Sequence, residues 1–145
     1  MKSAVVWREG MAFNGSLEGF DVPLDASPAF GGVGHGPKPK GLILTALAGC
    51  TAMDVISILR KMRITPDTFS VDAEGELATE HPRVFTEIVL HYRFEGEELP
   101  LAKLRKAITL SETRYCPVNA MLAPSTPIRS ELWVNGHRQD LEAAA

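Results

Sequence analysis

The segment from Leu42 to Met62 is the most apolar part of the chain, and it constrains the fold more than any other feature. It is rich in leucine, alanine and methionine, which favour helix, and the basic residues Arg60, Lys61 and Arg63 suit a helix C-terminus. We therefore predict one helix of about six turns. Because this helix is apolar nearly all round, it should be buried at the centre of the fold. Its length also fits a membrane span, but Asp54 near its middle argues against that interpretation.

The rest of the chain predicts short strands and further helices. Apolar pieces separated by glycines before residue 25 indicate a small antiparallel meander, and a loop rich in glycine and proline follows over residues 27–39. After the long helix we predict strands over 68–78 and 84–94, a helix over 99–115, a short helix over 118–122 and a strand over 128–134. This order of elements is typical of an α+β protein.

Composition sets the class of protein. The chain has 145 residues, the size of one domain, so we predict a single domain over residues 1–145. Its formal net charge is −3 and it has no long run of like charges, so we expect neither nucleic acid nor a membrane as a partner. Residues 1–8 lack the apolar stretch of a secretory signal, so we expect a cytoplasmic protein.

The two cysteines, Cys50 and Cys116, are the strongest candidates for reactive side chains. In a reducing cytoplasm they should be free thiols or a transient catalytic pair rather than a structural disulfide. The four histidines show no metal-ligand spacing, and a zinc site would need residues scattered along the chain, so we expect neither a metal nor a cofactor. Free cysteines are also common as small buried hydrophobic residues, and that inert role stays open for both.

The residues around the cysteines resemble the OsmC/Ohr superfamily, in particular its small OsmC-like branch. The resemblance rests on Gly-Pro-Lys-Pro at 36–39, on the apolar segment 42–59 with Gly-Cys at its centre, and on Tyr-Cys-Pro-Val at 115–118. The order of elements matches over nearly the whole chain. The resemblance implies an OsmC-like fold of antiparallel sheets, a long buried central helix and a second helix pair. It also implies an intertwined homodimer with a reactive-thiol site at the subunit interface.

The resemblance implies a chemistry as well. Well-studied members of the superfamily look like thiol peroxidases that reduce organic hydroperoxides in the oxidative-stress response. One cysteine attacks the peroxide, a second forms a disulfide with it, and a dithiol of the dihydrolipoyl type is the reductant. By position, Cys50 corresponds to the attacking cysteine and Cys116 to the resolving one.

The chain departs from the family pattern close to the attacking cysteine. The peroxidase branches have a glutamate ten residues before it, where this chain has Lys40, and an arginine in the upstream loop, where residues 27–34 contain none. The thiolate is the nucleophile and a free thiol has a pKa of about 8.5, so a nearby cation would help. Lys40 and Arg114 are candidates. Because ten residues of helix span about 15 Å, Lys40 would reach Cys50 only through a turn near Gly41 or from a partner subunit.

Two further polar residues are candidates for the site. Asp54 follows Cys50 by one helical turn and should share its face. An ionised Asp54 would disfavour a negative charge on the sulfur, or it would accept the thiol proton; its alternative role is a structural hydrogen bond between helices or subunits. His35, in the loop before the helix, would act as an acid or base at the site or lie in solvent.

Two functions therefore compete. The first is reduction of organic hydroperoxides by a Cys50/Cys116 redox pair, with an activity weakened or retuned by the missing glutamate and arginine. The second is a non-peroxidase protein of the same fold, whose interface pocket binds a small apolar molecule or whose thiols sense the redox state. A purely structural role is a third possibility.

Overall fold

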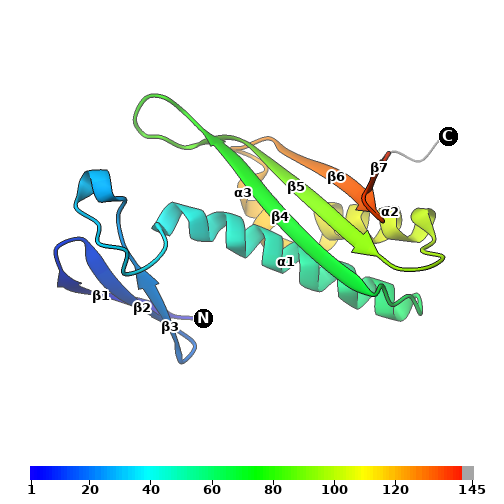
Figure 1. Cartoon of the computed structure of the whole chain (residues 1–145), viewed down its shortest axis with the longest axis horizontal. Helices are drawn as coiled ribbons and strands as arrows, with labels where there is room; N and C mark the ends of the chain where they lie inside the picture. The colour runs from blue at the N-terminus through cyan, green and yellow to red at the C-terminus, as the bar shows by residue number, and fades with distance from the viewer. Residues whose placement is uncertain (142–145) are drawn as a thin grey trace. The chain divides into compact units, whose positions relative to one another are not determined.

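A computed structural model describes residues 1–141 of the chain and divides it into two compact units, one over Met1–Ile43 and one from Leu44 onward. Each unit contains one β-sheet, and the described elements include three α-helices (Figure 1). The expected α+β class is confirmed. The single domain over residues 1–145 stays a prediction, and its last four residues lie outside the described part.

The first unit is the expected antiparallel meander. Its strands are β1 (Ser3–Glu9), β2 (Ala12–Leu17) and β3 (Phe20–Leu24), paired in that order. The loop that follows contains a short 3-10 helix, η1 (Pro28–Phe30), and is organised by the buried carboxylate of Asp25. That carboxylate accepts hydrogen bonds from the backbone N–H groups of Val33 and His35, each at 2.9 Å. One acidic side chain thus fixes the glycine-rich loop.

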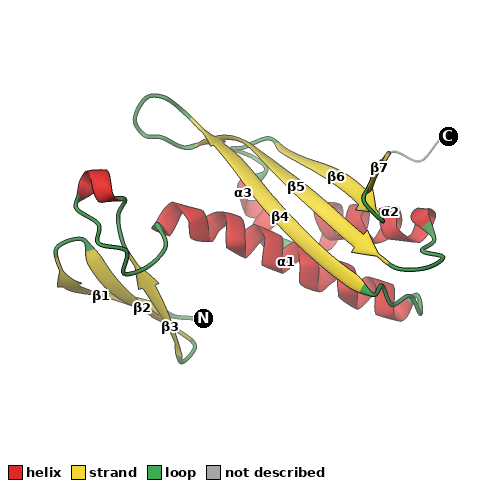
Figure 2. Cartoon of the chain, in the orientation of Figure 1, coloured by secondary structure: helices red, strands yellow, loops and turns green. Residues whose placement is uncertain are grey.

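The second unit is a four-stranded sheet with helices on one face (Figure 2). Helix α1 (Pro39–Lys61) leads into it from the first unit. It is followed in the chain by β4 (Thr68–Leu77), β5 (Phe85–Glu95), α2 (Leu101–Leu110), the π-helical turn η2 (Ser111–Tyr115), α3 (Pro117–Leu122), β6 (Ile128–Val134) and β7 (His137–Gln139). The sheet order is β4-β5-β6-β7. This sheet differs from the expectation in one pair: β5 and β6 run parallel, because α2, η2 and α3 form a crossover between them.

Strand β5 supplies the centre of the core. Ile88, Leu90, Tyr92 and Phe94 alternate along it and are fully or almost fully buried, as their shared parity predicts. They pack against α1 and against the buried face of α2, which carries Leu104, Ala107 and Ile108. The strand β7 was not expected, because its three residues carry no apolar alternation.

Helix α1 differs from the prediction in how it is buried. Within one chain only the stripe Leu47, Thr51, Val55 and Leu59 is fully covered, whereas Met53 is 76% exposed. The expectation of burial all round is therefore not met within one chain. The helix is long and apolar enough to cross a membrane by length and composition, a property that core helices share. That no membrane partners the chain stays a prediction.

Candidate thiol site

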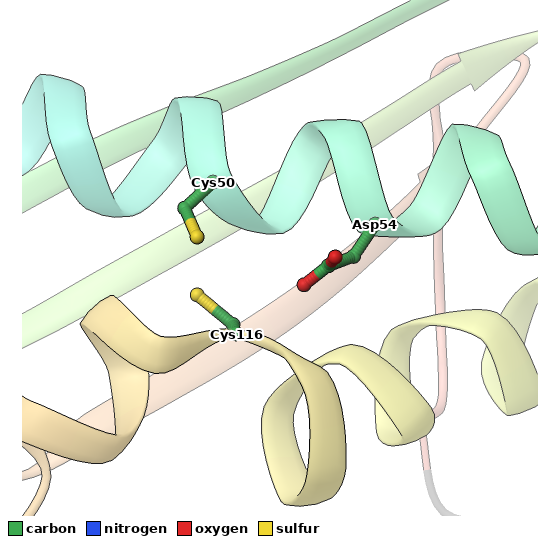
Figure 3. A group of neighbouring side chains, drawn as sticks. All are labelled: Cys50, Asp54 and Cys116. Atoms are coloured by element: carbon green, nitrogen blue, oxygen red, sulfur yellow. The ribbon is translucent and has the colours of Figure 1, made fainter.

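The two cysteines come together from different elements of the second unit. Cys50 lies in the middle of α1, and Cys116 lies at the junction of η2 and α3. Cys116 has an extended backbone (φ −73°, ψ 103°) because Pro117 follows it, so the helix ends there and a new one begins. Figure 3 shows the two sulfurs pointing toward each other, with the Asp54 carboxylate beside them. One ligand atom from each of the three residues lies within 4.8 Å of the other two, and both thiols are free.

The two thiols have different surroundings. Cys116 is only 2% exposed, whereas Cys50 is partly open. The Cys116 sulfur accepts a hydrogen bond from the backbone N–H of Asn119 at 3.3 Å. Burial, with a smaller effect of the neighbouring Cys50 thiol, nevertheless raises the pKa of Cys116 to about 11. Cys116 is therefore protonated at neutral pH, and Cys50 is the more accessible of the two thiols.

A chain of buried hydroxyl groups leads to Asp54. Ser111 Oγ donates to Asp54 Oδ2 at 3.2 Å, and Thr51 Oγ1 is 2.8 Å from Ser111 Oγ and 2.7 Å from the Tyr92 hydroxyl. Each hydroxyl carries one proton. Since the Ser111 proton points to Asp54, Thr51 donates to Ser111 and Tyr92 donates to Thr51. The hydrogen bonds therefore run in one direction, from the sheet to the carboxylate.

A second set of hydrogen bonds holds the π-helical turn that precedes Cys116. The Ser130 hydroxyl donates to the Glu112 carboxyl. Burial raises the pKa of Glu112. The side-chain amide of Asn119 also donates to the Glu112 backbone carbonyl at 2.9 Å. Cys116 is thus positioned by bonds on both sides of the turn.

The hydroxyl groups were missed in the sequence, although they left a signal. Thr51 interrupts the apolar stripe of α1, Tyr92 interrupts that of β5, and Ser111 continues the spacing of the apolar face of α2. A hydroxyl in an apolar stripe needs a buried partner. Three such residues in separate elements predict a shared network, but not which residues pair.

The other candidate residues lie in different surroundings. Gly41 is helical, so the chain does not turn there, and that route from Lys40 to Cys50 is closed. Arg114 is exposed, with its guanidinium 5.4 Å from the centre of the Tyr115 ring. His35 is exposed in the first unit, where its ring hydrogen-bonds to Asn14 at 2.7 Å. Of the supporting candidates, Asp54 is the one that the described structure places at the thiols.

Comparisons with known proteins agree with this architecture. A family model described as OsmC-like protein matches residues 32–131. Protein YhfA of Escherichia coli K12 is 36% identical over 129 residues, which cover 88% of this chain and 93% of YhfA.

Two solved structures illustrate the fold. An OsmC like protein from Mycoplasma pneumoniae has a TM-score of 0.78 at 18% identity, covering 92% of this chain and 95% of its own. An organic hydroperoxide resistance protein from Elizabethkingia anophelis has a TM-score of 0.71 at 14% identity, covering 92% and 94%. At these identities the structures support the fold alone.

Proposed function

Because the chain belongs to the OsmC-like family, we propose that it reduces organic hydroperoxides with Cys50 and Cys116 as its redox pair. One observation carries the proposal: two free thiols from separate elements face each other, with their sulfurs within 4.8 Å. A disulfide needs the sulfurs at about 2.05 Å, so the two thiols must move closer together when one forms.

The surroundings of the thiols support the roles that we propose for them. Cys50 is the more accessible thiol, so its thiolate attacks the distal peroxide oxygen. The O–O bond breaks, the alcohol leaves with a proton, and Cys50 becomes a sulfenic acid. The Cys116 thiol then displaces water from this sulfenic acid and forms the disulfide. An external dithiol reduces the disulfide and is itself oxidised to a disulfide.

Asp54 is the group placed to move the thiol proton. Its carboxylate lies beside both sulfurs and accepts the hydroxyl of Ser111. In this mechanism it accepts the Cys50 proton before attack and returns it to the departing alkoxide. Asp54 thus takes a proton-transfer role at Cys50, but it does not supply the positive charge that an arginine would bring to the thiolate. A reducing cytoplasm, where both thiols stay free between turnovers, is the setting that we propose.

The test is oxidation of the reduced chain by cumene hydroperoxide. We expect the intact mass to fall by two hydrogen atoms and both titratable thiols to disappear. Cys116→Ser should stop at the sulfenic acid, which dimedone traps, and Cys50→Ser should leave the peroxide unconsumed. If the wild-type chain keeps two titratable thiols while a control thiol peroxidase reacts, the proposal is wrong.

A second function is that of a non-peroxidase protein, whose interface pocket binds a small apolar molecule or whose thiols sense the redox state. It is favoured by Lys40 at the position of the missing glutamate. Two hollows of the second unit, one lined by Ile56, Ile64 and Phe69 with their neighbours and the other mostly by charged residues of the sheet, contain no cysteine. If Cys50→Ser abolishes a dithiol-dependent peroxide turnover, this second function is excluded as the main one.

We also propose that the chain works as a homodimer. The uncovered faces of α1, with Met53 and Ile43 exposed, provide apolar surface for a second copy. Sedimentation at micromolar concentration should give the mass of two chains, and Met53→Glu should reduce association. A stable monomer under these conditions would contradict the dimer.

A further inference from the structure

We propose that Cys50, Cys116 and Asp54 bind a thiophilic divalent cation, best matched by Zn²⁺, when both thiols are reduced. The two sulfurs and a carboxylate oxygen lie within 4.8 Å of one another (Figure 3). This proposal departs from the expectation of no metal site. That expectation rested on the spacing of the ligands in the sequence, whereas the fold brings distant residues together.

The separation of the ligand atoms suits a tetrahedral ion. With Zn–S bonds of about 2.3 Å, two sulfurs on one zinc lie about 3.8 Å apart. With a Zn–O bond of about 2.0 Å, a sulfur and the oxygen lie about 3.5 Å apart, so the ligand atoms need to close by about 1.3 Å at most from the upper limit of 4.8 Å. Side-chain rotation of Cys50 and Asp54, which are both only partly buried, can supply this movement.

The donor set selects the kind of cation. Two thiolates and one carboxylate combine soft and hard ligands, which zinc accepts and which magnesium and calcium do not. Three protein ligands leave the fourth position open, as in catalytic zinc sites. The partly open side of Cys50 and Asp54 gives water access to that position.

The neighbouring groups already orient two of the three ligands. Ser111 donates to the Asp54 carboxylate, and the Asn119 backbone N–H donates to the Cys116 sulfur. Such partners of metal ligands fix the ligand atoms and favour their deprotonated forms.

The chemistry of binding and release balances without a further reactant. On binding, two S–H bonds break, their protons pass to water, and two Zn–S bonds form with no change in oxidation state. On exposure to a hydroperoxide, the two thiolates give up two electrons and form the disulfide. The hydroperoxide takes up these electrons with two protons, yielding alcohol and water, and Zn²⁺ leaves. The ion is therefore bound only while both cysteines are reduced, and oxidation of the pair releases it.

The experiment is a titration of the full-length reduced chain, freed of metal, with Co²⁺ under argon. We expect one Co²⁺ per chain, with thiolate charge-transfer bands in the near ultraviolet and the strong visible bands of a tetrahedral site. One equivalent of Zn²⁺ should remove these bands. The absence of such bands, while a thiol assay finds both cysteines reduced, would overturn the proposal.

Variants separate the three ligands. Cys50→Ser and Cys116→Ser should each lose the charge-transfer bands, with Cys50→Ala and Cys116→Ala as replacements if a serine variant fails to fold. Asp54→Asn should weaken binding at least about 10-fold and Ser111→Ala about 10-fold. Asp67→Asn, an exposed carboxylate outside the cluster, is the matched control and should change nothing. If Asp54→Asn binds Co²⁺ with unchanged affinity, or if the charge-transfer bands persist when one of the cysteines is replaced, the assigned site is wrong.

Metal binding and peroxide reduction are tested by different readouts. One equivalent of Zn²⁺ should slow the reaction of both thiols with a disulfide reagent at least 10-fold, and a chelator should restore it. Thiols that react at the same rate with and without Zn²⁺ would overturn the proposal. Neither result alters the mass change expected of the metal-free chain with hydroperoxide.

Discussion

The two units of the chain differ in how far the apolar side chains of their strands are buried. In the second unit, the apolar residues of β5 are buried by α1 and α2. In the first unit all seven residues of β1 are exposed, among them Val5, Val6 and Trp7. The second unit therefore carries its own core and holds the thiols in it. The first unit presents apolar surface that a second copy of the chain would cover in the proposed homodimer.

The largest expected difference between the units comes from the same truncation in each sheet. Leu90 in β5 is 1% exposed and Leu17 in β2 is 38% exposed. Leu90→Ala should lower the free energy of unfolding by about 2–5 kcal/mol, because it leaves a cavity. Leu17→Ala should change it by less than about 1 kcal/mol. Urea denaturation measures both. Equal losses would mean that the first unit is as well covered as the second.

A smaller effect is expected from removing one buried hydroxyl. Tyr92→Phe takes away the donor to Thr51 and should cost about 1–2 kcal/mol in the free energy of unfolding. Ser3→Ala in the first unit removes an exposed bond to the Ser16 carbonyl and should cost almost nothing. A Tyr92→Phe chain as stable as the wild type would show that the hydroxyl chain does not hold the core together.

The smallest expected effect is on the pH dependence of stability. Asp25 of the first unit and Glu112 of the second contribute to it with opposite signs. The backbone N–H of His35, with those of Val33 and other loop residues, holds the pKa of Asp25 below its ordinary 3.8. The contribution of Asp25 to the stability of the folded chain is therefore present above pH 3.8, and it is lost as the pH falls through the pKa of Asp25 in the folded state. Burial raises the pKa of Glu112 above its ordinary 4.5, so its contribution is present below pH 4.5 and is lost as the pH rises through the folded value.

Two substitutions separate these contributions. Asp25→Asn should flatten the loss of stability in acid, and Glu112→Gln should flatten the loss as the pH rises above 4.5. Urea midpoints measured across the acid and neutral range give both slopes. If either variant keeps the wild-type slope, the carboxyl in question does not control that part of the profile.

Much of the fold could be predicted from local patterns. The alternation in β5 identified the core face of the strand, and the sequence predicted β6 at Ile128–Val134. The parallel pairing of β5 with β6 could not be predicted in the same way. It depends on how the intervening helices cross the sheet, and that depends on packing rather than on local propensity.

The candidate site was predictable only in part. Family motifs singled out Cys50 and Cys116, and helical spacing placed Asp54 beside Cys50. Lys40 and Arg114 are basic and lie near the motifs in the sequence. Charge and proximity in the chain do not determine where a long side chain lies, and Arg114 packs on Tyr115 instead.

The sequence by itself determined the elements that carry the site: a long helix with a cysteine and an aspartate on one face, and a second cysteine held at a helix boundary by Pro117. Propensity, periodicity and proline geometry act between near neighbours, so they can be read without the fold. The tertiary structure alone decided that α1 and the junction of η2 and α3 meet. It also decided that Ser111, Thr51 and Tyr92 join in one network. Those contacts depend on which buried faces pack together, and chain order does not encode that directly.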